Sequence, residues 1–316
     1  MAMNRVQFQR GLSMHDFMDL YGTPQQCEQA LVSWRWPEGY RCPSCGSASH
    51  TTFRRRSLLY MQCTACRFQC SPIAGTIFEA TKLPLTKWFL AMHLLTQAKT
   101  NMSMLELSRH VGVSYPTAWL MKHKLMEVMR LRERSRRLTG RVEIDDAYLG
   151  GERSGGKPGR GSENKVPFVA AVQTTESGEA KFVCLAQLPF TNEALQRFAD
   201  RSLVRPLTVV TDGLACFAVT QTAGVHERIV TGGGKASAAN PKFNAVNTTL
   251  SNLKTAISGA YHAIGFQKYA HRYLAEFQYR FNRRFDLSVI LRRLAIVAAR
   301  SSPMNRVFIR KADVGC

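Results

Sequence analysis

The sequence has no run of 18 or more apolar residues, and its first five residues lack the apolar core of a signal peptide. A membrane-spanning helix and export are therefore both disfavoured. Acidic residues are also scarce, 22 against 43 Lys and Arg, which leaves a net charge of +21. This surplus points to a polyanionic partner, either nucleic acid or an anionic membrane surface. We expect a cytoplasmic protein.

Disulfide bonds are not expected, because nine cysteines cannot all pair within one chain and a reducing compartment keeps thiols free. Four of the cysteines form two Cys-x-x-Cys pairs, Cys42 with Cys45 and Cys63 with Cys66. At this separation four thiolates can surround one Zn²⁺ tetrahedrally, and the β-prone residues between the pairs fit a zinc ribbon. Two redox pairs, or buried free thiols, are the alternative.

Helical periodicity follows the cysteines. Helices are expected over residues 82–98, 103–110 and 115–129, and a turn over residues 111–114 joins the second helix to the third. A helix, a short turn that contains glycine and a further helix are typical of a helix-turn-helix, whose second helix enters the DNA major groove. An ordinary helical hairpin is the alternative. The basic residues Lys122, His123, Lys124 and the arginine-rich stretch 130–137 favour DNA.

The pattern changes to β-strands at residue 142. Residues 142–151 are typical of a strand, yet they carry the adjacent carboxylates of Asp145 and Asp146 where a buried strand should be apolar. Asp212 ends a second apolar strand, and a helical segment over 243–254 contains Asn247. Oxygen ligands on three separate elements suit a divalent metal, whereas capping of turns by the aspartates is the structural alternative.

The second half of the chain reads as three strands in a meander, then helix, strand, helix, strand and a long helix. This α/β order matches the ribonuclease H-like fold. A glycine-rich basic stretch, 153–162, is either a flexible connection or a loop that contacts phosphate. We expect a helical lead-in, a zinc ribbon, a helix-turn-helix DNA-binding domain, a ribonuclease H-like catalytic domain and a C-terminal tail, over residues 1–40, 41–80, 81–138, 139–290 and 291–316.

Taken together, the motifs resemble bacterial insertion-sequence transposases of the Asp-Asp-Glu superfamily, in the group with a zinc ribbon, a helix-turn-helix and an Asp-Asp-Asn variant of the catalytic set. The resemblance rests on residues 142–151, 159–165, 211–213, 246–248 with Lys254, and 273–284. It implies that Asp145, Asp212 and Asn247 are the catalytic set. Lys254, two helical turns after Asn247, then lies on the same helix face and is expected to hold the DNA backbone.

The implied activity is that of a two-metal-ion DNA transposase, which binds terminal inverted repeats, cleaves a phosphodiester and transfers the strand to target DNA. Two Mg²⁺ or Mn²⁺ per active site and one structural Zn²⁺ are the implied cofactors. The partners are the double-stranded terminal repeats and target DNA, with a homodimer or larger assembly on DNA at the nucleoid and no membrane. Asp146 is the alternative first ligand and Glu276 the alternative third. A ribonuclease H-like nuclease or resolvase, or an inactive DNA-binding regulator, are the alternative functions.

Overall fold

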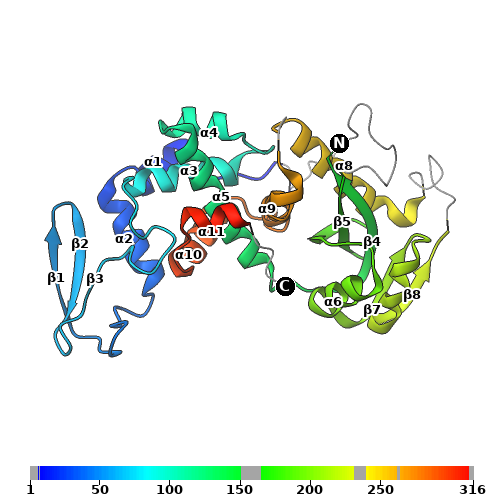
Figure 1. Ribbon diagram of the computed structural model, residues 1–316, viewed down its shortest axis with the longest axis horizontal. Coiled ribbons are helices and arrows are strands. Elements are labelled where there is room, and N and C mark those ends of the chain that lie inside the picture. The colour runs from blue at the N-terminus through cyan, green and yellow to red at the C-terminus, as the bar shows by residue number, and fades with distance from the viewer. Residues whose placement is uncertain (1–5, 7, 151–164, 231–239, 262–263, 313–316) are drawn as a thin grey trace. The chain divides into compact units, whose positions relative to one another are not determined.

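The computed structural model describes residues 6, 8–150, 165–230, 240–261 and 264–312 (Figure 1). The chain forms two compact units. Of the described residues, the first takes those up to 128 together with 285–311, and the second takes those from 129 to 284 together with Ala312. Among the described helices, none has the length and apolar character needed to cross a membrane.

The core of the first unit is built by helices. They are α1 (Met14–Tyr21), α2 (Pro24–Arg35), α3 (Leu85–Gln97), α10 (Ile290–Arg300) and α11 (Arg306–Lys311). Aromatic side chains join three of them, because the rings of Tyr21, Trp34 and Phe89 lie 5.3 to 5.9 Å apart between centroids. Ring pairs at such distances add to the free energy gained from burial alone.

The C-terminal residues are more than the tail expected from the sequence. Helix α10 buries one continuous face and packs on α2 and α3. Its buried residues recur at helical spacing: Ile290, Leu291, Leu294, Ala295, Ala298 and Ala299. A stripe of this kind is the core-facing side of an amphipathic helix. Helix α10 therefore belongs to the core of the first unit.

Helices α4 (Met104–Val111) and α5 (Tyr115–Glu133) form a helix-turn-helix. Ser103 and Glu106 build a capping box at the start of α4, which satisfies two backbone N–H groups that have no partner within the helix. Gly112 ends α4 with a φ of 64°, a left-handed conformation that glycine adopts without steric cost. The turn expected at residues 111–114 is confirmed.

The second unit is organised around a five-stranded sheet of order β6-β5-β4-β7-β8 (Figure 1). Strands β4 (Leu138–Leu149), β5 (Val166–Thr174) and β6 (Ala180–Gln187) form an antiparallel meander. Strands β7 (Leu203–Thr211) and β8 (Gly224–Arg228) run parallel to β4 on its other side. This mixed order is that of the ribonuclease H-like fold, as the sequence predicts.

Helices cover both faces of this sheet. Helices α8 (Asn244–Ser258) and α9 (Phe266–Phe281) bury Val246, Leu250 and Leu274 against the face that carries Ala147 and Leu149. On the other face lie α6 (Asn192–Ser202) and η2 (Ala215–Ala223), packed against residues such as Val142 and Ile144. Alternate residues of β4 therefore point to the two layers, which is the period-two pattern of a strand.

The segment expected as a helix over 214–222 is a 3₁₀-helix, η2, rather than an α-helix. The hydroxyls of Thr220 and Thr222 donate to the carbonyls of Phe217 and Val219, three residues earlier. Such bonds fit the tighter three-residue turn, in which residues i and i+3 lie above one another. Gly224 then begins β8 where a Cβ atom would lie 2.1 Å from the carbonyl oxygen of Leu207, so this approach of β7 and β8 requires glycine.

Candidate metal centres and catalytic site

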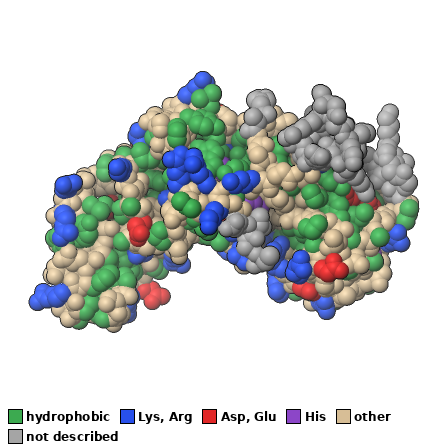
Figure 2. Space-filling model, viewed as in Figure 1, with side chains coloured by type: hydrophobic (Ala, Val, Ile, Leu, Met, Phe, Trp, Pro, Cys, Tyr) green, Lys and Arg blue, Asp and Glu red, His purple; other side chains and the backbone are tan. Residues whose placement is uncertain are grey.

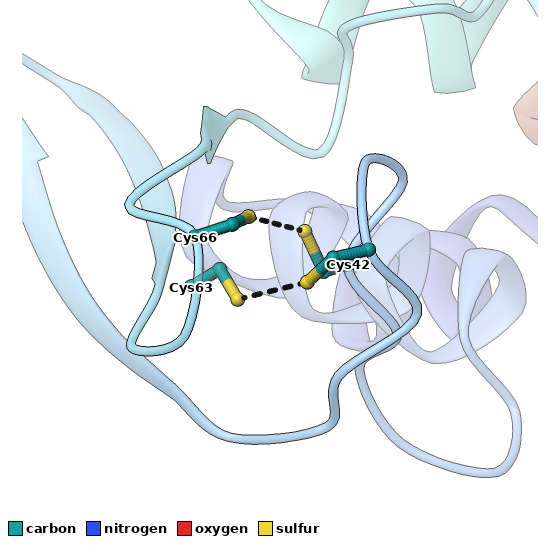
Figure 3. A group of neighbouring side chains, drawn as sticks. Cys42, Cys63 and Cys66 are labelled. Carbon is teal, nitrogen blue, oxygen red and sulfur yellow. Dashed lines mark hydrogen bonds between the residues drawn. The ribbon is translucent and has the colours of Figure 1, made fainter.

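The four cysteines of the two Cys-x-x-Cys pairs converge on one point of the ribbon (Figure 3). The Sγ atoms of Cys42 and Cys66 lie 3.5 Å apart, and those of Cys45 and Cys63 lie 3.6 Å apart. All four sulfur atoms fall within 4.8 Å of one another. Four thiolates in this arrangement are the ligand set of a structural Zn²⁺ site.

Two equivalent turns aim these thiols. After the first pair, the N–H of Gly46 donates to the carbonyl of Cys42 at 2.9 Å, and after the second, Arg67 donates to Cys63 at 3.0 Å. Both residues have a left-handed backbone, with φ of 76° and 61°. The N–H groups of Cys66 and Ala65 bond the Cys63 sulfur and hold the pKa of this thiol below its usual range. Backbone donors thus favour the thiolate form that binds metal.

The ribbon is held to the helices of the first unit by Glu28 of α2. Its carboxylate accepts from Arg54 at 2.6 Å and from the N–H of Leu59 at 3.3 Å. Arg54 lies in β1 (His50–Arg55) and Leu59 in β2 (Leu58–Cys63), and these strands with β3 (Gln69–Cys70) form the ribbon's sheet. Arg54 is thus paired with an acid of α2.

The second candidate metal centre lies in the second unit, where strand β7 ends beside the C-terminal half of β4. One carboxylate oxygen from each of Asp145, Asp146 and Asp212 lies within 4.8 Å of the others. The parallel pairing of β4 with β7 sets Ile144 opposite Thr211, so the residues that follow, Asp145 and Asp212, lie side by side. This register brings together two aspartates that are far apart in the sequence.

The proximity of Asp146 corrects one expectation. Alternation along a strand predicts that only one of two adjacent side chains faces a site. Asp145 lies on the face of β4 that α8 covers, and Asp146 lies on the opposite face, but a carboxylate extends two bonds beyond Cβ and both reach the strand edge. Asp146 is therefore a third carboxylate beside the expected pair.

Electrostatics at this cluster favour a cation. Burial, and after it the negative charges of Asp146 and Asp212, raise the pKa of Asp145 from 3.8 to about 7. The backbone N–H of Asp146, which donates to Oδ1 of Asp145 at 2.9 Å, and the charge of Lys254 oppose this rise in the pKa. Three carboxylates gathered in a half-buried place repel one another, and a divalent cation removes that repulsion. The donor set therefore fits Mg²⁺ or Mn²⁺.

Helix α8 carries the two remaining predicted site residues. Asn247 is half-buried in its first turns, and Lys254 is exposed two turns later. An open groove beside the carboxylates is lined by Asp146, Tyr148, Lys165, Lys254 and Tyr261, among others. Two ammonium groups in a groove next to an acidic cluster suit a phosphodiester that must approach those acids.

Glu143 anchors the start of α8, and the sequence analysis missed it. Its buried carboxylate accepts from the N–H of Val246 at 2.9 Å and pairs with Arg141 at 2.6 Å. Arg141 also donates to the carbonyl of Lys242, just before the helix. An acid at a helix N-terminus satisfies an unpaired N–H and interacts well with the helix dipole. The available signal was an acidic residue inside an apolar strand, two positions before Asp145.

Glu276, the alternative third ligand, is not part of the carboxylate cluster found in the described residues. It is fully buried in α9, and the Tyr261 hydroxyl donates to its Oε2 at 2.9 Å. Burial, and then the charge of Glu276, raise the pKa of Tyr261 well above its usual value. The glycine-rich stretch 153–162 lies outside the described residues.

The helix-turn-helix differs from expectation in its basic residues. Lys122 and His123 are fully buried, and the ammonium of Lys122 donates to the carbonyl of Met102. Lys124 donates to the carbonyl of Ile77 at 3.1 Å and lies over the Trp88 ring. These cations serve the core of the first unit, because α5 is buried on most sides after its first turn. The exposed residues of α5 are Tyr115 and Pro116 in that first turn and Arg132 near the end of the helix.

Comparison with known proteins matches two segments of the chain. Residues 137–282, which hold the sheet and all three aspartates, are similar to the ISXO2-like transposase domain, and residues 22–69 are similar to the transposase zinc-ribbon domain. Each of the two matching segments carries one of the candidate metal centres.

A curated relative of this chain is the uncharacterized protein in transposable element ISH50 of Halobacterium salinarum, 32% identical over 209 residues. The match covers 59% of this chain and 66% of the relative, slightly less than two thirds of its length. Solved structures with some likeness include the Mos1 strand transfer complex, at 12% identity and TM-score 0.26 over 68% of this chain and 78% of that one. The pre-cleavage Mos1 transpososome matches at 9% identity and TM-score 0.24, over 96% and 100%. These TM-scores are too low to carry an argument.

Proposed function

We propose that this protein is a metal-dependent DNA transposase, which binds the terminal inverted repeats of its element, cleaves DNA there and transfers the strand to target DNA. The observation that carries the proposal is the carboxylate cluster on β4 and just after β7, within the segment that matches the transposase domain. A DNA enzyme of this kind acts in the cytoplasm, at the nucleoid.

Asp145, Asp212 and Asn247 are the residues that would hold two Mg²⁺ or Mn²⁺ ions. Divalent ions held by these residues would supply the Lewis-acid activation of water, and of the freed 3′-hydroxyl, for in-line attack on a phosphodiester. The amide of Asn247 offers an oxygen ligand without charge, so the carboxylates of Asp145 and Asp212 supply the neutralising charge. Asp146 lies close enough to share in that charge.

The other residues of the site bind and position the substrate. Lys254 and Lys165 line the groove beside the carboxylates, where their ammonium groups would hold the phosphates on either side of the cleaved bond. Glu143 fixes the first turn of α8, and thereby the place of Asn247 relative to β4. Cys42, Cys45, Cys63 and Cys66 would hold one Zn²⁺ that stabilises the ribbon.

DNA recognition is assigned to the first turn of α5. Ser114, Tyr115 and Pro116 are exposed, and the Ser114 hydroxyl lies 2.9 Å from that of Thr117. Contacts from the beginning of the second helix to base edges are the usual geometry of a helix-turn-helix. Pairing two element ends would require at least a homodimer on DNA.

A strand-transfer assay tests this function. Purified protein is incubated with a labelled duplex that carries the inverted repeat flanking the gene, a supercoiled plasmid as target, and Mg²⁺ or Mn²⁺. We expect the labelled end to become joined to the plasmid, and the joined product to disappear with EDTA. Cleavage without joining would indicate a nuclease or resolvase instead. Specific binding of the repeat without either reaction would indicate a regulator.

A further inference from the structure

A pocket beside the edge strand β6 is lined by four arginines of the second unit. Its cavity has a volume of about 100 Å³, and its lining includes Arg130, Arg134, Arg136 and Arg201. A single water needs only about 10–15 Å³, so the cavity has room for a larger polar group. Figure 2 shows Lys and Arg side chains gathered beside α6, one of the elements that form the pocket.

The one acid in the pocket wall does not balance these charges. Glu133 is buried and accepts from Asn282 at 2.7 Å and from Gln278 at 3.3 Å, and it forms a tight ion pair with Arg283. Arg136 also lies near it, with Nε of Arg136 at 4.0 Å from the Glu133 carboxylate. The carboxylate of Glu133 is therefore directed mainly toward Gln278, Asn282 and Arg283, and it offsets little of the positive charge of the pocket arginines.

The pocket arginines also repel one another. Arg130 and Arg134 are four residues apart on a continuing helical turn, since the N–H of Arg134 donates to the carbonyl of Arg130. Like charges at this spacing destabilise a helix. Partial desolvation, and then the charges of Arg134 and Arg130, lower the pKa of Arg201, which reaches the same place from α6. An anion in the pocket removes this repulsion.

The register of the sheet relates the pocket to the carboxylates. Asp145 pairs with Ala170 of β5, and Ala170 pairs with Leu185 of β6, which lines the pocket. Two steps between neighbouring strands amount to about 10 Å. The grooves of DNA are about 6 to 12 Å wide, so a duplex with one phosphate at the carboxylates brings another phosphate within reach of the β6 edge.

We propose that the arginine pocket formed by Arg130, Arg134, Arg136 and Arg201 is a second DNA-backbone site, which binds a phosphate other than the one that is cleaved. Guanidinium groups suit this ligand, because they form paired hydrogen bonds to phosphate oxygens. The inference rests on the proposed function, and it adds a contact that positions the duplex across the sheet.

The test replaces phosphates of the DNA one at a time. Duplexes of the inverted repeat that flanks the gene are made with a neutral methylphosphonate at successive positions, and their affinities for the full-length protein are measured. We expect the wild-type protein to lose on the order of 10-fold in affinity at one or two positions a fixed distance from the cleavage site. The variant Arg134→Gln/Arg201→Gln should bind the unmodified duplex more weakly and show no further loss at those positions.

The variant Arg197→Gln/Lys268→Gln is the matched control, since it removes the same charge from exposed positions outside the pocket. It should keep the position-specific loss. If the wild-type and Arg134→Gln/Arg201→Gln proteins respond alike at every position, the pocket proposal is wrong while the proposed function stands. If the wild-type protein binds no repeat duplex at low salt, the proposed function itself is wrong. Thermal unfolding of each variant confirms that it is folded.

Discussion

The buried carboxylate of Glu143 accepts a hydrogen bond from the backbone N–H of Val246 at 2.9 Å. This bond joins the strand that carries Asp145 to the helix turn that carries Asn247. Glu143 stands two residues before Asp145, and Val246 stands next to Asn247, so one contact fixes both parts of the proposed site relative to each other. The place of Asn247 thus depends on a residue outside the ligand set.

Replacing Glu143 should therefore affect stability and activity together. Glu143→Ala leaves the Val246 N–H and Arg141 without their buried partner, which costs about 3 kcal/mol in the free energy of unfolding. Glu143→Gln keeps an oxygen acceptor for Val246 and should lose less. Denaturant unfolding and strand transfer measure the two effects. The exposed pair of Arg205 and Asp200 is the control, because Arg205→Ala should cost less than about 1 kcal/mol.

The ribbon should lose its fold with its metal. We expect freshly purified protein to contain one zinc per chain, and Cys45→Ser to contain much less, with protease cleavage appearing within residues 41–70. The reason is that a four-thiolate site this small depends on the metal for folding. Cys216→Ser, in the core of the second unit, should keep its zinc. Elemental analysis that finds no zinc in reduced wild-type protein contradicts the assignment.

Metal-free protein should become less stable as the pH rises from about 4 to about 7. The pKa of Asp145 is raised from 3.8 to about 7 in the folded state, so the folded protein holds this proton more tightly than the unfolded chain does. The protonated Asp145 carboxyl contributes fully to stability below its pKa in the unfolded chain, and this contribution is lost as the pH rises through its pKa in the folded protein. Thermal unfolding in EDTA at several pH values, compared with Asp145→Asn, measures it. An identical pH profile for the two proteins would be the contrary result.

The third ligand is tested by variants of Asn247. Asn247→Ala should lose cleavage and strand transfer on the order of 100-fold or more, with binding of the repeat retained, because it removes one oxygen from the reacting centre. Asn247→Asp restores the charge used by the wider superfamily and should keep more activity than Asn247→Ala. Glu276→Gln keeps the acceptor for the Tyr261 hydroxyl and should remain active. A folded but inactive Glu276→Gln, beside an active Asn247→Ala, would transfer the role to Glu276.

The spacing of apolar residues along the sequence was enough to predict most of the fold, because the strands and helices show clear apolar periodicity and many of them are followed by glycine or charged residues. It also placed Asp145 inside one apolar strand and Asp212 at the end of another, and the parallel pairing of these strands brings the two aspartates together. Pattern could not show that Lys122 and His123 are buried, because a basic residue on a helix contacts solvent or core depending on its neighbours. The same limit applies to Glu143 and Glu133, whose partners Val246 and Arg283 come from distant segments.

The central claim is that the carboxylates of Asp145 and Asp212 carry out metal-dependent strand transfer. It is tested most directly by the single-turnover rate of strand transfer from a pre-cleaved repeat end in Mg²⁺, for the wild-type protein, Asp145→Asn, Asp212→Asn and the control Arg197→Gln. We predict joined product with the wild type and the control. We predict none with either aspartate variant, although both bind the repeat as tightly as the wild type. Wild-type rates in either aspartate variant would contradict the account.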